Sequence, residues 1–479
     1  MITDMNDICV LEDDVLSRAL EVMNDTALGI VFVTDKSRKL VGVLTDGDVR
    51  RALLKNGQLQ DKIRGIYNKD FFALPVVAEN DIIIRSFTEQ IRIIPLLDSV
   101  GKVVDYASAK RLRSIPIATP QLLGNELAYV NDCISTAWIS SQGKYVSKFE
   151  ENFKSLCKMP DALAVSNGTV ALHLALVALG IGPGDEVIVP DLTFAASANA
   201  VFHAGATPVL ATIDRDTWTL SSESLARLIT KRTKAVMPVH LYGHPCDMDT
   251  IRDIANQTNL FVIEDCAEAL GSLYRGDHVG SFSDASTFSF FGNKTITTGE
   301  GGMVLFKNPD IGRRARMLRD HGMSPQKKYW HTEVGYNYRM TNIQAALGVA
   351  QMERLAFFVD AKRKIAAGYK KILSRSPHII LPPEQSWATN SYWLFTFLLK
   401  DSAPLEPQEL RTAMAMRGIE TRPVFYALHT MPPYEKIARD TDMRNSLEIS
   451  ARGISLPSYV QLTEQERDFI AEIIVKLIS

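Results

Sequence analysis

The stretch Phe288-Ser289-Phe290-Phe291-Gly292-Asn293-Lys294, followed by Thr297-Thr298-Gly299-Glu300-Gly301-Gly302, decides how the rest of the sequence is interpreted. A lysine in a mostly apolar, aromatic segment is unusual because ammonium groups normally stay in water. Burial would lower the pKa of Lys294 and expose a neutral amine, which is a nucleophile. The glycines that follow would let the backbone turn close to a bound planar group. The alternative for Lys294 is a surface side chain whose stem packs on apolar neighbours.

A second polar segment, Ser166-Asn167-Gly168-Thr169, lies between an apolar run and an amphipathic helix. Free backbone N–H groups at a helix start, a glycine that permits close approach and a threonine hydroxyl suit a phosphate group. The same four residues would also form an ordinary turn and helix cap.

The third segment is Leu260-Phe261-Val262-Ile263-Glu264-Asp265, an apolar strand that ends in two acids. Ligands of α/β proteins bind at this carboxyl edge of the sheet, where a carboxylate can pair with a protonated ring nitrogen or a cation. Asp265 could instead cap the next helix. A phosphate cradle, a strand-end aspartate and a buried lysine in one domain fit pyridoxal 5'-phosphate (PLP), with Lys294 as the Schiff-base lysine.

The sequence around these segments alternates between strand-like and helical runs from about residue 121 onward. The expected strands are Val187–Pro190, Thr207–Thr212, Ala235–Val239, Phe261–Glu264 and Gly302–Phe306. This alternation predicts an α/β fold with a mostly parallel sheet. Segments near 362–373, 393–399, 409–417 and 464–477 predict a smaller α+β lobe, so we expect a large domain over 115–360 and a small one over 361–479.

The first 114 residues contain two weak copies of one unit, at 30–53 and 91–112, and prolines at 112–120 mark a domain boundary. Each copy reads as strand, turn, strand and helix start, with a helical pattern before it at 15–23 or 82–91. The first copy ends in Gly42, Thr45 and Asp48, a pattern that resembles the CBS motif. This resemblance implies a small α+β CBS pair in which Thr45 and Asp48 bind an adenine nucleotide. The second copy departs from the motif, with Asp105, Ser108 and Arg111 at these places, so a dimerisation or docking module without ligand is the alternative.

The composition excludes several classes of protein. The chain has 479 residues, which suggests about three domains. The 53 basic and 55 acidic side chains give a net charge of −2, so nucleic acid is not an expected partner. The longest apolar runs fall short of the roughly 18 residues of a membrane span, and acids occupy the place of a signal peptide's basic residues. Five scattered cysteines predict no structural metal, and we expect a cytoplasmic protein.

Residues from about 116 to 479 closely resemble the DegT/DnrJ-type nucleotide-sugar aminotransferases, which have PLP fold type I. Within them the likeness is greatest to the GDP-perosamine synthase branch, through Tyr329-Trp330-His331 and 421–426. The other motifs that carry the resemblance are Gly124–Leu127, Trp138–Gly143, Ser166–Thr169, Glu264–Glu268, Phe288–Gly302 and Gly335–Asn342.

The resemblance implies a role for each matching residue. Lys294 would hold PLP covalently and move the proton, and Asp265 would keep the pyridine nitrogen protonated. Glu268 would lie near the ring hydroxyl, and Phe194 would stack on the ring. The cofactor phosphate would be bound by Gly168, Thr169 and Ser289, and by Asn337 of the neighbouring subunit of a homodimer or higher homo-oligomer. Sugar or donor contacts would come from His321, Tyr329 and Arg422.

The implied reaction transfers an amino group from L-glutamate to a nucleotide-linked 4-keto-6-deoxy sugar. The product would be a perosamine-like 4-amino sugar for surface polysaccharide, such as an O-antigen. Some members of the family carry histidine at the lysine position and dehydrate the sugar, so Lys294 implies transamination. The alternatives are a UDP- or dTDP-linked keto sugar as substrate, or a nucleotide-sensing regulatory protein with an inert aminotransferase body.

Overall fold

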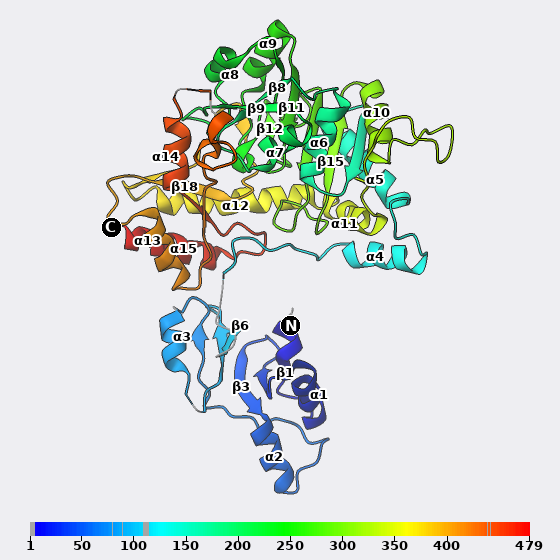
Figure 1. Cartoon of the computed structure of the whole chain (residues 1–479). Helices are drawn as coiled ribbons and strands as arrows, with labels where there is room; N and C mark the ends of the chain where they lie inside the picture. Colours follow the sequence, from blue (N-terminus) through cyan, green and yellow to red (C-terminus); the bar gives the residue numbers. More distant parts are fainter. Residues whose placement is uncertain (1–4, 79, 89, 109–114, 438, 441) are drawn as a thin grey trace. The chain divides into compact units, whose positions relative to one another are not determined.

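The computed structural model describes residues 5–78, 80–88, 90–108, 115–437, 439–440 and 442–479 (Figure 1). The chain forms two compact units, 1–115 with 412–419 and 116–411 with 420–479. Arg111 and the predicted boundary after residue 114 fall within 109–114, outside the described residues.

The first unit contains two three-stranded sheets of the same design. In each sheet the first strand is parallel to the second, and the second is antiparallel to the third. The strands are β1 (Cys9–Leu11), β2 (Ile30–Thr34) and β3 (Leu40–Thr45) in one sheet, and β4 (Leu74–Pro75), β5 (Ile93–Leu97) and β6 (Val103–Ser108) in the other. The helical segments are η1 (Met5–Ile8), α1 (Leu16–Thr26), α2 (Asp46–Leu54) and α3 (Asn80–Ser86).

One local prediction in this unit was wrong. The helix predicted over 82–91 ends at Ser86, because the Thr88 hydroxyl accepts the backbone N–H of Ile91 at 2.9 Å and turns the chain. Ser108 is the last residue of β6, where Ile93 is its strand partner, and the helix predicted to follow it falls on residues outside the described part of the chain. The two copies therefore match up to this residue, since Thr45 likewise ends β3 opposite Ile30.

The second unit is built around a seven-stranded sheet in the order β7-β15-β14-β11-β10-β8-β9. Only β15 runs opposite to the other six strands, so the predicted mostly parallel sheet is confirmed. The strands are β7 (Asp161–Val165), β8 (Glu186–Pro190), β9 (Thr207–Ala211), β10 (Thr233–Val236), β11 (Phe261–Asp265), β14 (Ala285–Ser289) and β15 (Gly302–Phe306).

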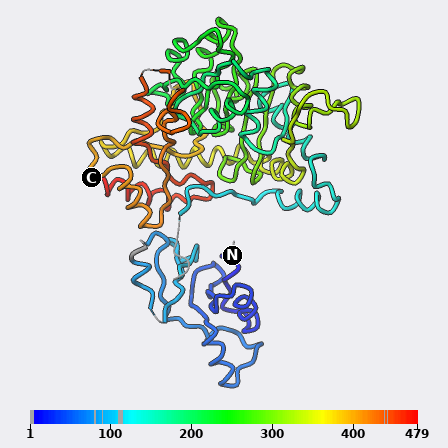
Figure 2. The backbone as a smooth tube through the Cα atoms, in the orientation of Figure 1, coloured from blue at the N-terminus to red at the C-terminus, as the bar shows by residue number. Residues whose placement is uncertain are grey.

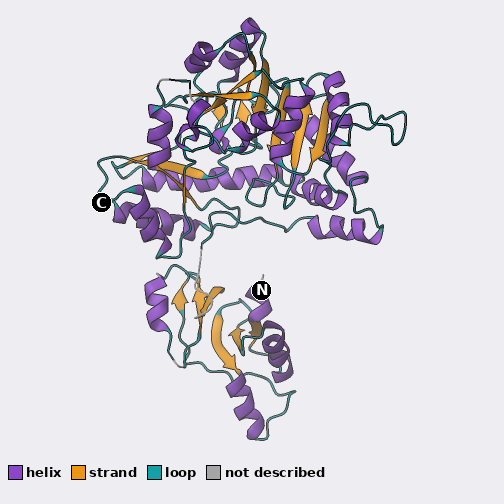
Figure 3. Cartoon of the chain, viewed as in Figure 1, coloured by secondary structure: helices purple, strands orange, loops and turns teal. Residues whose placement is uncertain are grey.

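Helices cover both faces of this sheet (Figure 3). Side chains alternate along each strand, so Val187 and Val189 of β8 join one core and Ile188 joins the other. One face packs against α6 (Gly168–Ala178), α7 (Ala196–His203) and α10 (Pro309–Arg319). The other packs against α5 (Lys144–Cys157), α8 (Ser222–Leu228), α9 (Met248–Thr258) and α11 (Asn342–Met352).

A smaller lobe completes this unit, and Figure 2 follows it in yellow to red. Its antiparallel sheet has the order β16-β18-β20-β19, with β16 (Ile379–Ile380), β18 (Phe395–Leu399), β20 (Gly453–Leu456) and β19 (Arg422–Pro423). Its helical segments are α12 (Leu355–Leu373), η3 (Leu428–Thr430), η4 (Glu435–Ile437), α14 (Arg444–Arg452) and α15 (Glu464–Leu477), while α13 (Pro407–Ala415) is divided between the two units at residue 412. A minor sheet joins β12 (Leu273–Tyr274), β13 (Asp277–His278) and β17 (Ala388–Thr389), and α4 (Glu126–Ser135) precedes α5.

The sheet brings the three polar segments of the sequence to one edge. Strands β7, β11 and β14 point the same way, so the residues that follow or end them meet at their carboxyl ends. None of the helices in the described part of the chain combines the length and apolar character needed to cross a bilayer.

Candidate active site

A cavity of about 660 Å³ lies at this carboxyl edge of the large sheet. Strand ends supply its floor, and aromatic residues of both lobes supply its walls. The predicted residues that line it are Gly168, Thr169, Phe194, Asp265, Glu268, Ser289, Lys294 and Arg422.

Lys294 follows β14 and is largely buried, with 13% of its side chain exposed. Its Nζ lies 3.7 Å from Oε1 of Glu268 and 3.9 Å from the ring centroid of Trp393. Burial lowers the pKa of Lys294, while the negative charges of Glu268 and Asp265 oppose that fall. Lys294 is therefore a shielded amine, and the surface alternative is wrong.

Asp265 ends β11 and turns its carboxylate into the cavity. Oδ2 accepts the Ser197 hydroxyl at 2.8 Å, and Oδ1 accepts the backbone N–H of Ala267 at 3.1 Å. Burial raises the pKa of Asp265, and these two hydrogen bonds and Lys294 oppose the rise. A carboxylate has about four acceptor positions, so room remains for a ring N–H. No helix follows Asp265 directly, so it is not a helix cap.

The phosphate end of the cavity is formed where α6 begins. The Asn167 side chain caps this helix by accepting the N–H of Val170 at 3.0 Å, so the cap predicted as an alternative is present as well. The first N–H groups of a helix have no partner within it and can bind an anion. A Cβ on Gly168 would lie 2.8 Å from Cβ of Ser289. The close approach of the α6 start to Ser289 therefore requires glycine at 168, and the residues present fit PLP.

Glu268 is held in place by a strained residue. Its Oε2 accepts the backbone N–H of Tyr242 at 2.9 Å, and Tyr242, in η2 (Leu241–Gly243), has a φ of 51°. A bulky aromatic residue rarely adopts this left-handed conformation. Burial raises the pKa of Glu268 to about 7. Glu268 therefore titrates near neutrality within 3.7 Å of the Lys294 amine, whose own pKa is lowered by burial.

The aromatic walls include residues that sequence reasoning missed. Tyr242 stacks on Trp393 at 5.9 Å and on Phe425 at 5.6 Å, with interplanar angles of 12° and 13°. Phe194 lies 5.7 Å from Phe425 and is 59% exposed. Trp393 and Phe425 come from the small lobe, where an aromatic side chain in an apolar run is indistinguishable from core. Thr193 and Ser197 were missed as well, although the Leu192–Asn199 stretch has the small polar residues of a ligand loop.

Three predicted residues do not line the cavity. His321, Tyr329 and Asn337 are exposed, and Tyr329 has 76% of its surface accessible. Arg339 links two of them, donating to Nε2 of His321 and Oδ1 of Asn337 at 3.2 Å each. A single chain therefore brings eight of the residues predicted for the active site together around the cavity, and the other three lie outside it.

Thr45 and Asp48 occupy the start of α2 in the first unit and form a capping box. The Thr45 hydroxyl donates to Oδ2 of Asp48 at 2.6 Å, and Arg51 donates to Oδ1 at 2.6 Å. Burial acts to raise the pKa of Asp48, but these bonds outweigh burial and lower it. The Thr45 N–H and hydroxyl and the Arg51 guanidinium occupy three of about four acceptor positions on the carboxylate, so at most one remains for a ribose hydroxyl.

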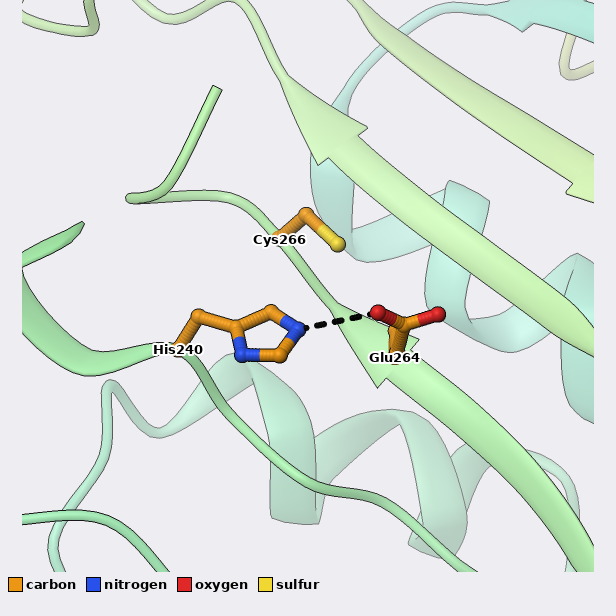
Figure 4. Close-up of side chains that lie close together, drawn as sticks. All are labelled: His240, Glu264 and Cys266. Atoms are coloured by element: carbon orange, nitrogen blue, oxygen red, sulfur yellow. Dashed lines mark hydrogen bonds and ion pairs between the residues drawn. The ribbon is translucent and has the colours of Figure 1, made fainter. Parts of the chain in front are cut away.

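A buried trio of His240, Glu264 and Cys266 lies behind this edge (Figure 4), and it is the only group of potential metal ligands found within the described residues. Nε2 of His240 lies 3.1 Å from Oε1 of Glu264, and Nδ1 accepts the N–H of Cys246 at 2.9 Å. Glu264 also accepts the N–H groups of Gly280 and Phe282 and the Ser283 hydroxyl. These bonds engage the nitrogen and oxygen atoms a metal would need, so the trio has a structural role.

The chain is similar to known proteins over both units. Residues 120–475 match the DegT/DnrJ/EryC1/StrS aminotransferase family, and residues 2–55 match the CBS domain. GDP-perosamine synthase from Escherichia coli O157:H7 is 48% identical over 368 residues, which are 77% of this chain and 100% of that protein. The enzyme of the same name from Caulobacter vibrioides is 48% identical over 358 residues, 74% of this chain and 96% of that protein.

A solved structure with the same fold is the PLP form of Spr1654 from Streptococcus pneumoniae. It is 28% identical, with a TM-score of 0.72, and the match covers 76% of this chain and 98% of that one. The predicted aminotransferase architecture with PLP as cofactor is thereby confirmed.

Proposed function

Because this chain belongs to the DegT/DnrJ/EryC1/StrS aminotransferase family, we propose that it transfers an amino group from L-glutamate to a GDP-linked 4-keto-6-deoxy sugar. The observation that carries this proposal is the convergence of Lys294, Asp265 and the start of α6 in one cavity. The 48% identity to GDP-perosamine synthases supports GDP as the nucleotide and a 4-amino sugar as the product.

The chain is an aminotransferase and its cofactor is PLP. When bound, PLP supplies an electron-withdrawing ring that stabilises negative charge at the carbon from which a proton is removed. The protein must hold this ring, protect the reacting amine and move the proton.

We assign these tasks to the residues that line the cavity. Asp265 would accept the ring N–H, and Gly168, Thr169 and Ser289 would hold the phosphate. Phe194 would cover one ring face. Lys294 would attach the cofactor and carry the proton, since its buried amine titrates closer to neutrality than a surface lysine does. Glu268 would face the ring hydroxyl. Arg422 stands at the wall of the cavity with the charge to bind a carboxylate or phosphate of a substrate.

The substrate proposal is tested by offering three nucleotide-linked 4-keto-6-deoxy sugars, carried by GDP, UDP or dTDP, to the purified chain with L-glutamate. We expect amino sugar only, or at least a hundredfold faster, from the GDP compound. Faster turnover of the UDP or dTDP compound would refute the nucleotide assignment and keep the aminotransferase. No turnover with any amino donor, in a chain that binds PLP, would favour a regulatory protein with an inert body.

We propose that the active unit is a homodimer. Apolar side chains on and beside α4 are exposed, and a run of this kind marks an interaction surface. They are Leu122, Leu123, Leu127, Ile134, Trp138 and Ile139, each more than 50% exposed. Asn337 lies outside its own cavity, and we propose that it serves the cavity of a partner. Sedimentation should give twice the 53.2 kDa of one chain, and a 53.2 kDa species with full activity would refute the dimer.

We further propose that the product enters surface polysaccharide synthesis in the cytoplasm, and that an adenine nucleotide binds the CBS unit through Thr45 and Asp48. Titration of AMP and ATP into the full chain tests the second point. Binding that is lost in Asp48→Ala supports it, and no measurable heat with either nucleotide refutes it.

A further inference from the structure

Asp265 is supported by two buried hydroxyl groups that the reaction chemistry does not itself require. Ser197 is the second residue of α7, and its Oγ donates to Oδ2 of Asp265 at 2.8 Å. The Thr193 hydroxyl lies 3.0 Å from the same Oγ. Thr193, Ser197 and Asp265 are 2%, 1% and 4% exposed, so water does not replace these bonds.

The charge on Asp265 decides which hydroxyl donates and which accepts in these two hydrogen bonds. An ionised carboxylate only accepts hydrogen bonds, so the Ser197 proton must point to Asp265. Ser197 then has only lone pairs to offer, and the Thr193 hydroxyl must donate to it. The other acceptor near Thr193, the Phe194 carbonyl, is more distant at 3.4 Å. Consecutive hydroxyl groups that point the same way strengthen one another in a low-dielectric site.

We propose that Thr193 and Ser197 are positioning residues, a two-hydroxyl chain that keeps Asp265 ionised and turned toward the ring nitrogen of PLP. The inference rests on the proposed role of Asp265. Oδ2 is engaged by Ser197 and Oδ1 by the N–H of Ala267, so the carboxylate cannot rotate without breaking one of these bonds. The acceptor positions of the carboxylate that remain open face the cavity.

Other charged groups near Asp265 act on it without orienting it. Lys294 favours its ionised form, and Glu268 opposes it once Glu268 is itself ionised. His240 also favours the ionised form through its charge, but its ring bonds Glu264 and Cys246, and only its backbone N–H reaches Asp265, at the carbonyl. Ser197 is the side chain whose hydroxyl bonds the carboxylate itself, and Thr193 reaches the carboxylate only through Ser197.

The test measures PLP affinity of the full-length, cofactor-free chain from pH 5 to 8, by visible absorbance of the bound cofactor. Affinity should fall on the acid side as Asp265 is protonated. Ser197→Ala should raise the pH midpoint of this fall by about one unit, because a hydrogen bond to a charge is lost. Thr193→Val should raise it by a smaller amount, about half a unit, because its effect passes through Ser197.

The double variant shows whether Thr193 acts on Asp265 through Ser197 or independently of it. If Thr193 acts only through Ser197, the midpoint of Ser197→Ala/Thr193→Val equals that of Ser197→Ala. If the midpoint shift in the double variant equals the sum of the two single shifts, or if Thr193→Val keeps the wild-type midpoint, the proposed two-hydroxyl chain is wrong. A wild-type midpoint in Ser197→Ala would overturn the whole proposal.

Two further variants serve as controls. Ser224→Ala removes another buried serine that donates to an aspartate, Asp440, away from the cavity, and should leave the midpoint unchanged. Asp265→Asn should remove the part of the acid-side fall that comes from Asp265, whatever part comes from Glu268, whose pKa is about 7. A wild-type profile in Asp265→Asn would refute the proposed role of Asp265, whereas a profile that changes there but is unmoved in Ser197→Ala refutes only the hydroxyl chain.

Discussion

Replacement of Glu268 by glutamine should lower the pKa of Lys294. The two side chains approach to 3.7 Å, and Glu268→Gln removes a negative charge while preserving shape. Glutamine also keeps an oxygen that can accept the N–H of Tyr242. A negative charge favours an ammonium group, so its removal shifts Lys294 toward the neutral amine.

The size of the shift follows from the separation. With an effective dielectric constant of about 20, two unit charges about 4 Å apart attract by about 4 kcal/mol, which corresponds to about three pKa units. This is an upper limit, because Glu268 has a pKa of about 7 and is fully charged only above that pH. We expect a fall of one to three units in the pKa of Lys294, seen most clearly above pH 7.

The assay is the rate at which acetic anhydride modifies Lys294 in the cofactor-free chain, followed across pH by mass spectrometry of its peptide. Only the neutral amine reacts, so the midpoint of the rate curve reports the pKa. The matched control is Glu300→Gln, which removes a more exposed carboxylate that lines the same cavity. An unchanged midpoint in Glu268→Gln, or an equal shift in Glu300→Gln, would refute the coupling.

Three other predictions follow from the same structure. Gly168→Ala should weaken PLP binding at least tenfold, because its Cβ would lie 2.8 Å from that of Ser289; unchanged affinity by fluorescence titration would contradict the cradle. Borohydride should fix PLP to the peptide of Lys294 in the wild type and to no peptide in Lys294→Ala; labelling elsewhere would reassign the attachment site. Lys362 is buried, donates to the carbonyls of Trp393 and Ser458, and has its pKa lowered by burial from 10.5 to about 7. The unfolded state therefore binds more protons between these values, and the free energy of unfolding should rise with pH there by up to about 1.4 kcal/mol per unit. Denaturant unfolding at pH 7 to 10 should show a smaller rise in the free energy of unfolding with pH for Lys362→Met than for the wild type. Identical slopes for the two proteins would contradict the lowered pKa of Lys362.

The sequence predicts those parts of the site that local chemistry marks. Lys294, Asp265 and Gly168 stand out because a buried lysine, a strand-end acid and a glycine at a helix start are each unusual locally. The alternating strands also predict the large sheet, since buried parallel strands are apolar runs bounded by polar residues.

Other parts depend on tertiary packing. Trp393 and Phe425 look like core residues in the sequence, and only the folded lobe places them against Tyr242. The left-handed backbone of Tyr242 has no local signal such as glycine or asparagine. Ser197 resembles any small residue at a helix start until β11 brings Asp265 to its hydroxyl. The exposed positions of Asn337 and Tyr329 likewise follow from the path of a loop, which composition does not fix.

The most direct test of the account is the fate of the amino nitrogen. The full-length chain with PLP is incubated with [15N]-L-glutamate and a GDP-linked 4-keto-6-deoxy sugar, and the mass of the sugar product is measured by mass spectrometry. We predict that the product carries one 15N atom, that 2-oxoglutarate forms in equal amount, and that Lys294→Ala yields neither. A sugar that remains a ketone, or a product that lacks the label, would contradict the account.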